Sequence, residues 1–360
     1  MSLPEFEVWD AASESDRESW IARWRSWPAR EVFAHPDYLL LGVEAGERPL
    51  CATAKSGERY VLYPFYLRTI RNESGGEEFS GAYNDISSPY GYGGPFSWGV
   101  GQDEGLSVAF WQAFGAWAKS QRVVSEVVRL SLFSESLLSY DGETRAIGEN
   151  VVRSLDVCGD DLWRDYEYKV RKNVKKAHTS GVRVHCDERG DRLDDFLRIY
   201  ASTMSRRNAS QRYQLPRNYF ESLHEKLAGQ FAYWHAVYND NVISTELVLI
   251  SAERVYSFLG GTDSDYFGLR PNDLLKVEII EWARRLGKKQ FVLGGGYTPN
   301  DGIYRYKLSF APTGRVPFLL GCRVFLEDVY MELSETHRAL SRAANCVGDE
   351  RPSFFPAYRA

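Results

Sequence analysis

Residues 291–310 read FVLGGGYTPNDGIYRYKLSF, and this stretch decides the fold that we expect for the chain. Its first three residues are apolar and predict a short buried strand, which runs into three glycines at 294–296. Glycine has no Cβ atom, so another backbone or a ligand can approach it closely. Turn-forming residues follow at 298–302, and then Lys307 stands among aromatic residues. A lysine where a sheet opens can hold its charge against an oxyanion or a phosphate. The alternative is an ordinary loop with a lysine in solvent.

The composition is that of a folded soluble protein. The chain has 360 residues, of which 44% are hydrophobic and 26% charged, and this length predicts two domains with a core each. Aromatic residues make up 14% of the chain, which suits clefts that hold polar ligands. No apolar run approaches the roughly 18 residues that a membrane-spanning helix needs, and the N-terminus does not resemble a signal peptide.

Cysteine and histidine spacing argues against metal chemistry. The five cysteines form no C-x-x-C pair, which fits a reducing cytoplasm, and the six histidines show no ligand spacing. We therefore expect a cytoplasmic protein without a metal site or a permanently bound cofactor. The net charge of −5 means that any contact with nucleic acid must use a local basic patch. The sequence does not indicate an oligomeric state.

The second half of the chain has the clearer order of elements. We expect a helix over 160–177, a short strand over 182–186, and helices over 191–207 and from Pro216 to Gly229. Three antiparallel strands, a crossover helix, the strand before the glycines and a short helix then follow. The remaining expected elements are strands at 230–238, 242–250 and 254–259, a helix at 272–286, and further strands at 290–293, 315–319 and 322–331. This order is an α+β arrangement of the GNAT N-acyltransferase type, in which two neighbouring parallel strands splay apart.

The sequence of the first half predicts a degenerate copy of the same arrangement. Helices are expected at 15–27, 35–43 and 103–120, with strands at 50–55, 60–68 and 126–132 and a glycine- and tyrosine-rich loop over 82–101. We therefore divide the chain into a degenerate GNAT-like domain (1–158), a catalytic GNAT-like domain (159–334) and a C-terminal tail (335–360). The predicted fold is two tandem GNAT-like domains with mixed, splayed sheets.

Three segments carry candidate chemistry. The run at 168–176 has five cations that can bind an RNA backbone or a diphosphate, and the alternative is a solvated helix face: Lys169, Arg171, Lys172, Lys175 and Lys176. In the loop over 84–95, Asp85 can accept a proton from an amine, and the alternative is a rigid structural loop. Arg206 and Arg207 can clamp a phosphate, or they can compensate the dipole at a helix C-terminus.

Several stretches together resemble the FemAB-like acyltransferases. These are HPDYLLL at 35–41, SPYGYGGP at 88–95, YKVRKNVKKA at 168–177, YASTMSRRNA with YQLPRNYF over 200–220, LRPNDLLKVEIIEWARRLG at 269–287, and FVLGGG with YRYKLSF at the glycine-rich end. The best-known members have two GNAT-like domains and transfer an aminoacyl group from aminoacyl-tRNA to an amine of a peptidoglycan precursor. The resemblance implies such a transfer here, to an amine of a cell-wall, polysaccharide or peptide-type precursor.

The resemblance also implies residue roles. Lys307 would stabilise the reacting ester or its oxyanion, with Phe310 packed beneath it. The predicted substrate-binding residues, which would line the splayed strands or face the acceptor, are Asp85, Ser88, Tyr90, Tyr92, Arg206, Tyr213, Gly294, Gly295, Gly296, Tyr304 and Phe310. The basic run at 168–176 would contact the acceptor end of tRNA.

The chain departs from its relatives in two ways. It lacks the helical pattern of the long arm found in staphylococcal-type members, so it resembles the compact type. The glycine-rich turn that holds coenzyme A in ordinary GNAT enzymes is replaced by residues 269–273, which read LRPND. Two alternatives stay open: an acyl-CoA-dependent transferase acting on a sugar amine or an amino acid, and a non-catalytic relative that binds a precursor.

Overall fold

The computed structural model describes residues 5–70, 83–100, 104–210, 213–343 and 354–359. The chain forms two compact units, each assembled from separate segments. The first unit comprises Met1–Trp27, Phe33–Ile147 and Phe318–Ala360, and the second comprises Pro28–Val32 and Gly148–Pro317. This division differs from the linear domains that the sequence predicts. The described end of the predicted tail packs with the first unit, because Arg359 and Tyr358 contact the buried Asp85.

The first unit contains a mixed sheet in the order β1-β2-β3-β4-β6-β13, with β5 paired to β3. Its strands are β1 (Glu5–Asp10), β2 (Glu47–Ser56), β3 (Arg59–Thr69), β4 (Asn84–Ser87), β5 (Phe96–Trp98), β6 (Val123–Arg129) and the C-terminal part of β13 (Arg315–Val324). Its helices are α1 (Glu14–Ser26), α2 (Pro36–Gly42), α3 (Glu104–Ser120) and α10 (Glu327–Ala343), with short 3₁₀ turns at Val32–Ala34, Ser134–Ser136 and Ala357–Arg359. Strands β4 and β6 pair in parallel. Aromatic side chains of α3 and β3, including Phe110, Phe114 and Tyr63, fill the core.

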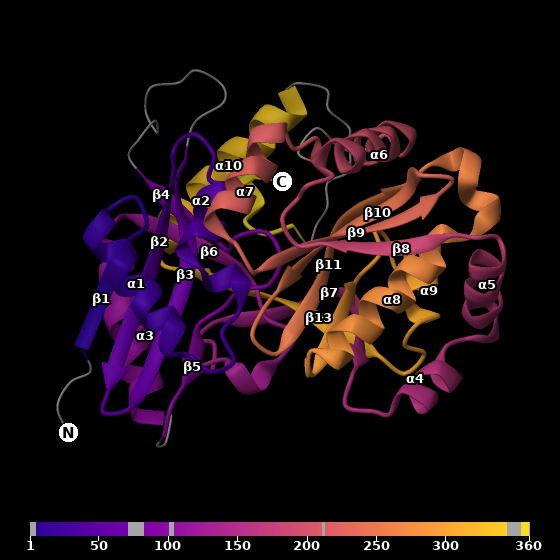
Figure 1. Ribbon diagram of the computed structural model, residues 1–360. Coiled ribbons are helices and arrows are strands. Elements are labelled where there is room, and N and C mark those ends of the chain that lie inside the picture. The colour runs from indigo at the N-terminus through magenta and orange to yellow at the C-terminus, as the bar shows by residue number, and fades with distance from the viewer. Residues whose placement is uncertain (1–4, 71–82, 101–103, 211–212, 344–353, 360) are drawn as a thin grey trace. The chain divides into compact units, whose positions relative to one another are not determined.

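The second unit has a sheet in the order β7-β12-β11-β10-β9-β8. Its strands are β7 (Glu143–Ser154), β8 (Arg183–Asp187), β9 (Phe231–Tyr238), β10 (Asn241–Ile250), β11 (Arg254–Thr262) and β12 (Gln290–Gly294). Its helices are α4 (Gly159–Asp165), α5 (Tyr168–Thr179), α6 (Leu193–Arg206), α7 (Arg217–Lys226), α8 (Pro271–Arg285) and α9 (Gly302–Leu308), with a 3₁₀ turn at Ser264–Leu269. Helix α8 is the crossover between the parallel strands β11 and β12. Figure 1 shows α6 on one side of this sheet and α8 with α5 on the other.

The core of the second unit explains why these segments form helices and strands. Helix α5 buries Val170, Val174 and Ala177, which recur at helical spacing, and α8 buries Leu275 and Ile279 in the same cluster. Strand β10 is buried over almost its whole length, as expected for a strand with neighbours on both sides. The sheet and its crossover helix therefore form one apolar body from which the strand ends project.

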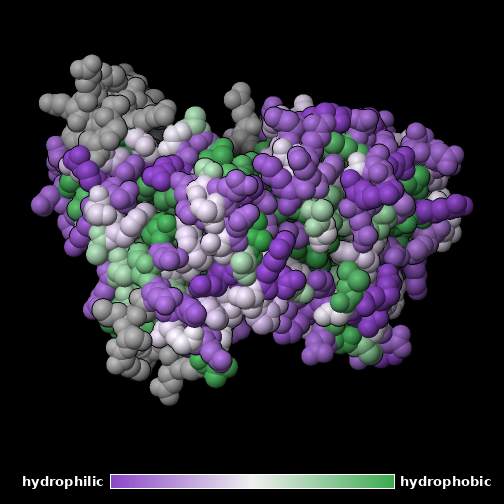
Figure 2. All heavy atoms as spheres, turned by 60° about the vertical axis from the view of Figure 1, so that its left-hand side comes forward, coloured by the Kyte–Doolittle hydropathy of each residue, from purple (hydrophilic) through white to green (hydrophobic). Residues whose placement is uncertain are grey.

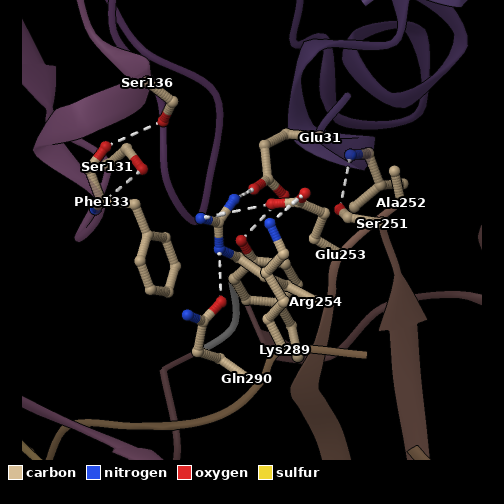
Figure 3. Close-up of polar contacts among 12 residues, drawn as sticks. Glu31, Ser131, Phe133, Ser136, Ser251, Ala252, Glu253, Arg254, Lys289 and Gln290 are labelled. Atoms are coloured by element: carbon tan, nitrogen blue, oxygen red, sulfur yellow. Dashed lines mark hydrogen bonds and ion pairs between the residues drawn. The ribbon is translucent and has the colours of Figure 1, made fainter. Parts of the chain in front are cut away.

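A short segment between α1 and α2 is fastened to the second unit by a buried ion pair (Figure 3). Arg254 Nη1 donates to Glu31 Oε1 at 2.7 Å, and the Tyr256 hydroxyl donates to Glu31 Oε2 at 2.8 Å. Arg254 Nε also donates to Gln290 Oε1 at 3.0 Å. The backbone N–H of Val32 adds a bond to Ser251 Oγ at 2.9 Å. These contacts make residues 28–32 part of the second unit.

The structure corrects several predicted elements. The single helix predicted over 160–177 is two helices, since Tyr166 is extended and Arg171 Nη1 donates to the carbonyls of Arg164 and Tyr166. The strand predicted at 322–331 is the end of β13 followed by α10, whose first turn holds Glu327 and Asp328. The described part of the loop predicted over 82–101 contains β4 and β5, and the predicted helix start at residue 103 lies outside the described residues. Strands β1 and β7 were not predicted.

Among the described helices, none is both long and apolar enough to cross a membrane. Figure 2 shows a face on which hydrophilic residues predominate and hydrophobic residues form small groups between them.

Candidate active site

The second unit opens where its two parallel strands part. Strands β11 and β12 are paired only at Arg254–Gln290, Val255–Phe291 and Tyr256–Val292, although β11 continues to Thr262 along β10. Beyond this point lies a cavity of about 1180 Å³, lined by side chains of α5, α6, β10, β11, α8 and α9. The splayed parallel pair that the sequence predicts is therefore confirmed.

Helix α9 carries Lys307 to the wall of this cavity. The helix begins at Asp301, whose Oδ1 accepts the backbone N–H of Tyr304 at 2.7 Å, while Oδ2 accepts that of Tyr297 at 2.7 Å. Near the end of the helix, Lys307 Nζ donates to the carbonyl of Gly295 at 2.7 Å. This is the hydrogen bond that the described residues show for Lys307, so two of its three N–H groups remain for a ligand.

The surroundings of Lys307 weaken its hold on a proton. Burial lowers the pKa of Lys307 to about 8, and the nearby Lys276 ammonium lowers it as well, whereas the carboxylates of Glu246 and Asp301 raise it. At neutral pH the side chain is therefore largely protonated, and it can lose its proton about one pH unit higher. Such a group serves either to stabilise negative charge or to accept a proton.

A second lysine lies buried in the same cavity. Lys276 of α8 donates to both carboxylate oxygens of Glu246, at 2.5 and 2.6 Å, and to Ser257 Oγ at 3.0 Å. All three residues line the cavity. Strand β11 approaches Glu246 closely here because position 260 is glycine: a Cβ there would lie 2.6 Å from the Thr245 carbonyl oxygen.

Another carboxylate lies at the start of α8. Asp273 is 8% exposed, lines the cavity and accepts a hydrogen bond from Asn173 Nδ2 at 3.1 Å. Burial raises the pKa of Asp273, and the hydrogen bond from Asn173 partly offsets this effect. The adjacent Asn272 Nδ2 donates to the Tyr306 hydroxyl at 2.8 Å, which ties α8 to α9. Carboxylates and ammonium groups therefore lie together in the cavity lining.

The cavity carries more positive than negative side chains. Seven lysines or arginines line it against four acidic residues, although the whole chain has a net charge of −5. Beyond Lys276 and Lys307, the cations are Lys169, Arg206, Arg207, Arg270 and Arg305. Two exposed aromatic rings, Phe267 and Tyr297, also lie in the lining, and the Arg206 guanidinium sits 5.0 Å from the ring centre of Phe267. Cations and exposed rings together favour a ligand with phosphates and planar groups.

Comparison with known proteins identifies this arrangement. A family model described as acetyltransferase (GNAT) domain matches residues 164–308, which contain the cavity-lining residues up to Leu308. The solved structure of FemX has a TM-score of 0.64 at 13% identity, covering 88% of this chain and 97% of that one. These matches assign residues 164–308 to a GNAT domain and give the chain the fold of FemX. The predicted α+β fold and the predicted resemblance are both confirmed.

Two further relatives extend the comparison. A curated Weissella viridescens protein, UDP-N-acetylmuramoylpentapeptide-lysine N(6)-alanyltransferase, is 24% identical over 173 residues, which cover 47% of this chain and 50% of the relative. The chain therefore aligns with about half the length of the curated relative that it matches. The C-terminal domain of a putative lysylphosphatidylglycerol synthetase from Agrobacterium fabrum has a TM-score of 0.53 at 14% identity, covering 85% and 92% of the two chains. At such identities the two solved structures show the shared fold alone.

The predicted glycines support Lys307 rather than line the cavity. Gly295 supplies the carbonyl that holds the ammonium group, and a Cβ there would lie 2.9 Å from the Glu149 carbonyl oxygen. Gly296 lies against Asp301, and Gly294 ends β12 with a positive φ of 83°. None of the three is among the residues that line the cavity.

Two predicted aromatic residues lie behind Lys307. The Tyr304 hydroxyl donates to Glu149 Oε2, and its ring is buried away from the cavity lining. Phe310 is fully buried against Tyr306 and Tyr166, with ring centres 5.1 and 6.0 Å apart. Both residues therefore support helix α9 from within the core.

The predicted basic run is divided between different environments. Lys169 lines the cavity, but Arg171 donates to backbone carbonyls at the break between α4 and α5. Lys172, Lys175 and Lys176 are exposed on α5 and do not line the cavity. The structure therefore places one of the five predicted cations at the candidate site.

The predicted residues at the end of α6 and after it lie in different places. Arg206 lines the cavity and donates to the Thr262 carbonyl at 3.2 Å, and its neighbour Arg207 is in the lining too. Tyr213 contributes its backbone carbonyl to the Tyr200 hydroxyl and does not line the cavity.

The predicted acceptor loop belongs to the first unit, where its polar groups have internal partners. Asp85 is fully buried and accepts hydrogen bonds from Arg68 and Arg359, so it is not available to bind an amine. Ser88 Oγ accepts the backbone N–H of Arg129 at 2.9 Å. Tyr92 packs edge-on against Phe33 and Phe318, and Tyr90 is exposed. The structural alternative for this loop holds for Asp85 and Ser88.

Sequence reasoning missed the polar centre of the cavity. Glu246, Lys276 and Asp273 stand within segments that read as a strand and a helix, where charged residues normally face solvent. Glu246 had a signal, because it is the one charged residue of 242–250, in a strand with neighbours on both sides. Phe267 and the glycines at 260–261 were likewise not singled out.

Proposed function

We propose that this chain transfers an aminoacyl group from aminoacyl-tRNA to an amine of a cell-wall, polysaccharide or peptide-type precursor. The observation that carries the proposal is the place of Lys307, whose ammonium group stands at the wall of an open cavity with two N–H groups unused. The name of the Weissella relative describes an alanyltransferase that acts on a lysine of a muramoylpentapeptide, which supports a peptidoglycan-type acceptor.

The reaction needs few groups from the protein. The acceptor amine attacks the ester carbonyl carbon, the carbon–oxygen bond to the ribose breaks, and the proton lost by the amine leaves with the ribose oxygen. In between, the carbonyl oxygen carries a negative charge, to which protonated Lys307 donates a hydrogen bond. Because the amine is already a fair nucleophile once uncharged, positioning and charge stabilisation supply much of the rate.

The lining of the cavity supports an RNA donor. A positive cavity in a chain of net charge −5 attracts a polyanion locally, and exposed rings such as Phe267 and Tyr297 can stack on unpaired bases. The acceptor end of tRNA offers both phosphates and unpaired bases beside its ester. Lys169 and Arg206 are the residues from the predicted sets that we place against this end.

An acyl-CoA donor is the second candidate, because the matching family model describes an acetyltransferase. The residues at the start of α8 argue against an acyl-CoA donor. The N–H groups of a helix N-terminus ordinarily bind a diphosphate, but here Pro271 provides no N–H and Asp273 places a buried carboxylate in the first turn. The carboxylate would repel a diphosphate at this point.

The test is transfer from tRNA charged with a labelled amino acid, with and without lysine-containing muramoyl peptide. We expect label to move from tRNA to the peptide amine only when both substrates are present. A thermal shift with acetyl-CoA separates the second candidate, since a ligand at 100 times its Kd adds about 2.7 kcal/mol of stability. Transfer from acetyl-CoA and none from tRNA would replace our proposal by that candidate.

A further inference from the structure

The second lysine of the cavity cannot itself bind a substrate. Lys276 Nζ has three N–H groups, and Glu246 Oε1, Glu246 Oε2 and Ser257 Oγ accept them. Lys276 and Glu246 are each 5% exposed. The Phe291 ring centre lies 5.5 Å from the Lys276 nitrogen and adds an apolar wall on that side. The pair is thus fixed in place, and it acts on its surroundings through charge.

Lys307 differs from Lys276 in the partners of its ammonium group. It lies in the same cavity, but a single backbone carbonyl, that of Gly295, holds its ammonium group. Unlike Lys276, it has no carboxylate within ion-pair distance among the described residues. Its protonation therefore depends on charges that surround it without touching it.

We propose that Lys276 and Glu246 are positioning residues whose opposed charges set the protonation of Lys307. The role in catalysis rests on the function proposed above, whereas the effect on protonation does not. A fixed cation beside Lys307 favours loss of its proton, and a fixed carboxylate favours retention. Because both charges are held in one rigid pair, their opposed effects on Lys307 largely offset each other, and Lys307 stays mostly protonated at neutral pH.

The charged groups that face Lys307 come from three elements. Lys276 of α8 lowers its pKa in the same direction as burial, which is the larger effect. Glu246 of β10 and Asp301 at the start of α9 raise it. The carbonyl of Gly295, after β12, accepts its hydrogen bond. Removing either member of the pair must therefore move the titration of Lys307, and the two removals must move it in opposite directions.

The direct test is an NMR titration of Lys307 in the full-length protein labelled with ¹³C-lysine, with the resonance assigned by its loss in Lys307→Arg. We expect Lys276→Gln to raise the midpoint by on the order of one pH unit, and Glu246→Gln to lower it. The double variant should return close to the wild-type midpoint. Lys288→Met is the matched control, because Lys288 is half-buried in the same unit but donates to the Ser251 and Ala252 carbonyls outside the cavity. It should leave the midpoint unchanged.

Opposite signs separate an effect of charge from structural damage, which has no reason to reverse between the two variants. Each single variant leaves one buried charge unpaired, so thermal unfolding of every variant is measured alongside. If one single variant does not fold, the other still decides by the direction of its shift, upward for Lys276→Gln or downward for Glu246→Gln. Midpoints that stay fixed in the single variants, or that shift in the same direction, overturn the proposal.

The outcome is independent of the transfer assay. Shifts of opposite sign in a protein without aminoacyl transfer would support the pairing and refute the proposed function. Transfer activity with an unmoved Lys307 midpoint would support the function and overturn the pairing. Where both hold, the alkaline limit of the rate should move with the NMR midpoint in each variant.

Discussion

The second unit contains two buried ion pairs that look alike by burial and differ in what surrounds them. Glu31 and Arg254 are 2% and 3% exposed, and Glu246 and Lys276 are 5% each. Around the first pair, the Tyr256 hydroxyl donates to Glu31 and the Arg254 guanidinium donates to Gln290, and these bonds fasten residues 28–32 to the second unit. The second pair lines the cavity that holds Lys307. Burial of charge alone therefore does not mark an active site.

Loss of the first pair and loss of the second pair should therefore have different effects. Breaking the first pair should affect folding and leave the chemistry of folded molecules intact, because none of its members lines the cavity. Disturbing the second pair should change the protonation of Lys307 as well as stability. Each of the following predictions tests this separation.

The largest effect on stability is expected from Arg254→Met. Removing one partner of a buried ion pair leaves the Glu31 carboxylate uncompensated, which costs about 3–5 kcal/mol of unfolding free energy. Urea unfolding followed by fluorescence measures the loss, and the double variant Glu31→Gln/Arg254→Met should recover part of it. The rate per folded molecule should equal that of the wild type. A lower rate in fully folded protein would remove the distinction between the two pairs.

The largest effect on the reaction alone is expected from Lys307→Met. Loss of one hydrogen-bond donor to an oxyanion lowers kcat by about 10²–10³-fold. Stability should change little, because Lys307 gives up a single bond to the Gly295 carbonyl and relieves the burial of a charge. Steady-state rates with charged tRNA measure the effect. Lys289→Met, at an ion pair with Glu253 outside the cavity, is the control and should react at the wild-type rate. An active Lys307→Met protein would contradict the assigned role.

The pH dependence follows from the lowered pKa of Lys307. With hydroxylamine as acceptor, which is uncharged at neutral pH, the rate should fall above about pH 8, approaching tenfold per pH unit, as Lys307 loses its proton. The free energy of unfolding should instead rise with pH over this range. Between about pH 8 and the ordinary lysine pKa, the unfolded chain binds more protons than the folded one, so Lys307 becomes less unfavourable to the fold as pH rises. The difference in unfolding free energy between wild type and Lys307→Met isolates this contribution. A rate that stays level to pH 10 would contradict the role assigned to protonated Lys307.

The two pairs also show which features can be predicted from the sequence alone. Lys307 and the glycines were predicted because glycine, turn residues and a lysine follow one another within twenty residues, and the splayed strands followed from the order of elements in the second half. The tertiary partners were not, since Glu246 lies 30 residues from Lys276 and Glu31 lies 223 residues from Arg254. Such pairs arise from strand register and from the return of residues 28–32 to the second unit. A single sequence contains no local signal for either.

The role predicted for Asp85 is wrong for a related reason, and Arg171 of the basic run does not line the cavity. Asp85 stands in a loop-like sequence, yet β4 buries it between Arg68 and Arg359, the latter 274 residues away. Arg171 reads as part of an exposed patch, yet the break between α4 and α5 frees carbonyls that its guanidinium satisfies. Composition predicts that charges gather in a segment, and the fold decides which of them face a ligand.

The smallest effect is expected from Asp301→Ala, and it touches both stability and titration. Asp301 caps α9 by accepting the N–H of Tyr304, and losing such a cap costs about 1 kcal/mol. Asp301 also raises the pKa of Lys307, so its removal should shift the alkaline fall in rate to lower pH. Asp301→Asn is the matched variant, because asparagine caps about as well but carries no charge. It should keep most of the stability and show the same shift in pH. A shift in the alanine variant alone would trace the effect to the helix rather than to the charge, and Lys276 and Glu246 would then remain as the charges that tune Lys307.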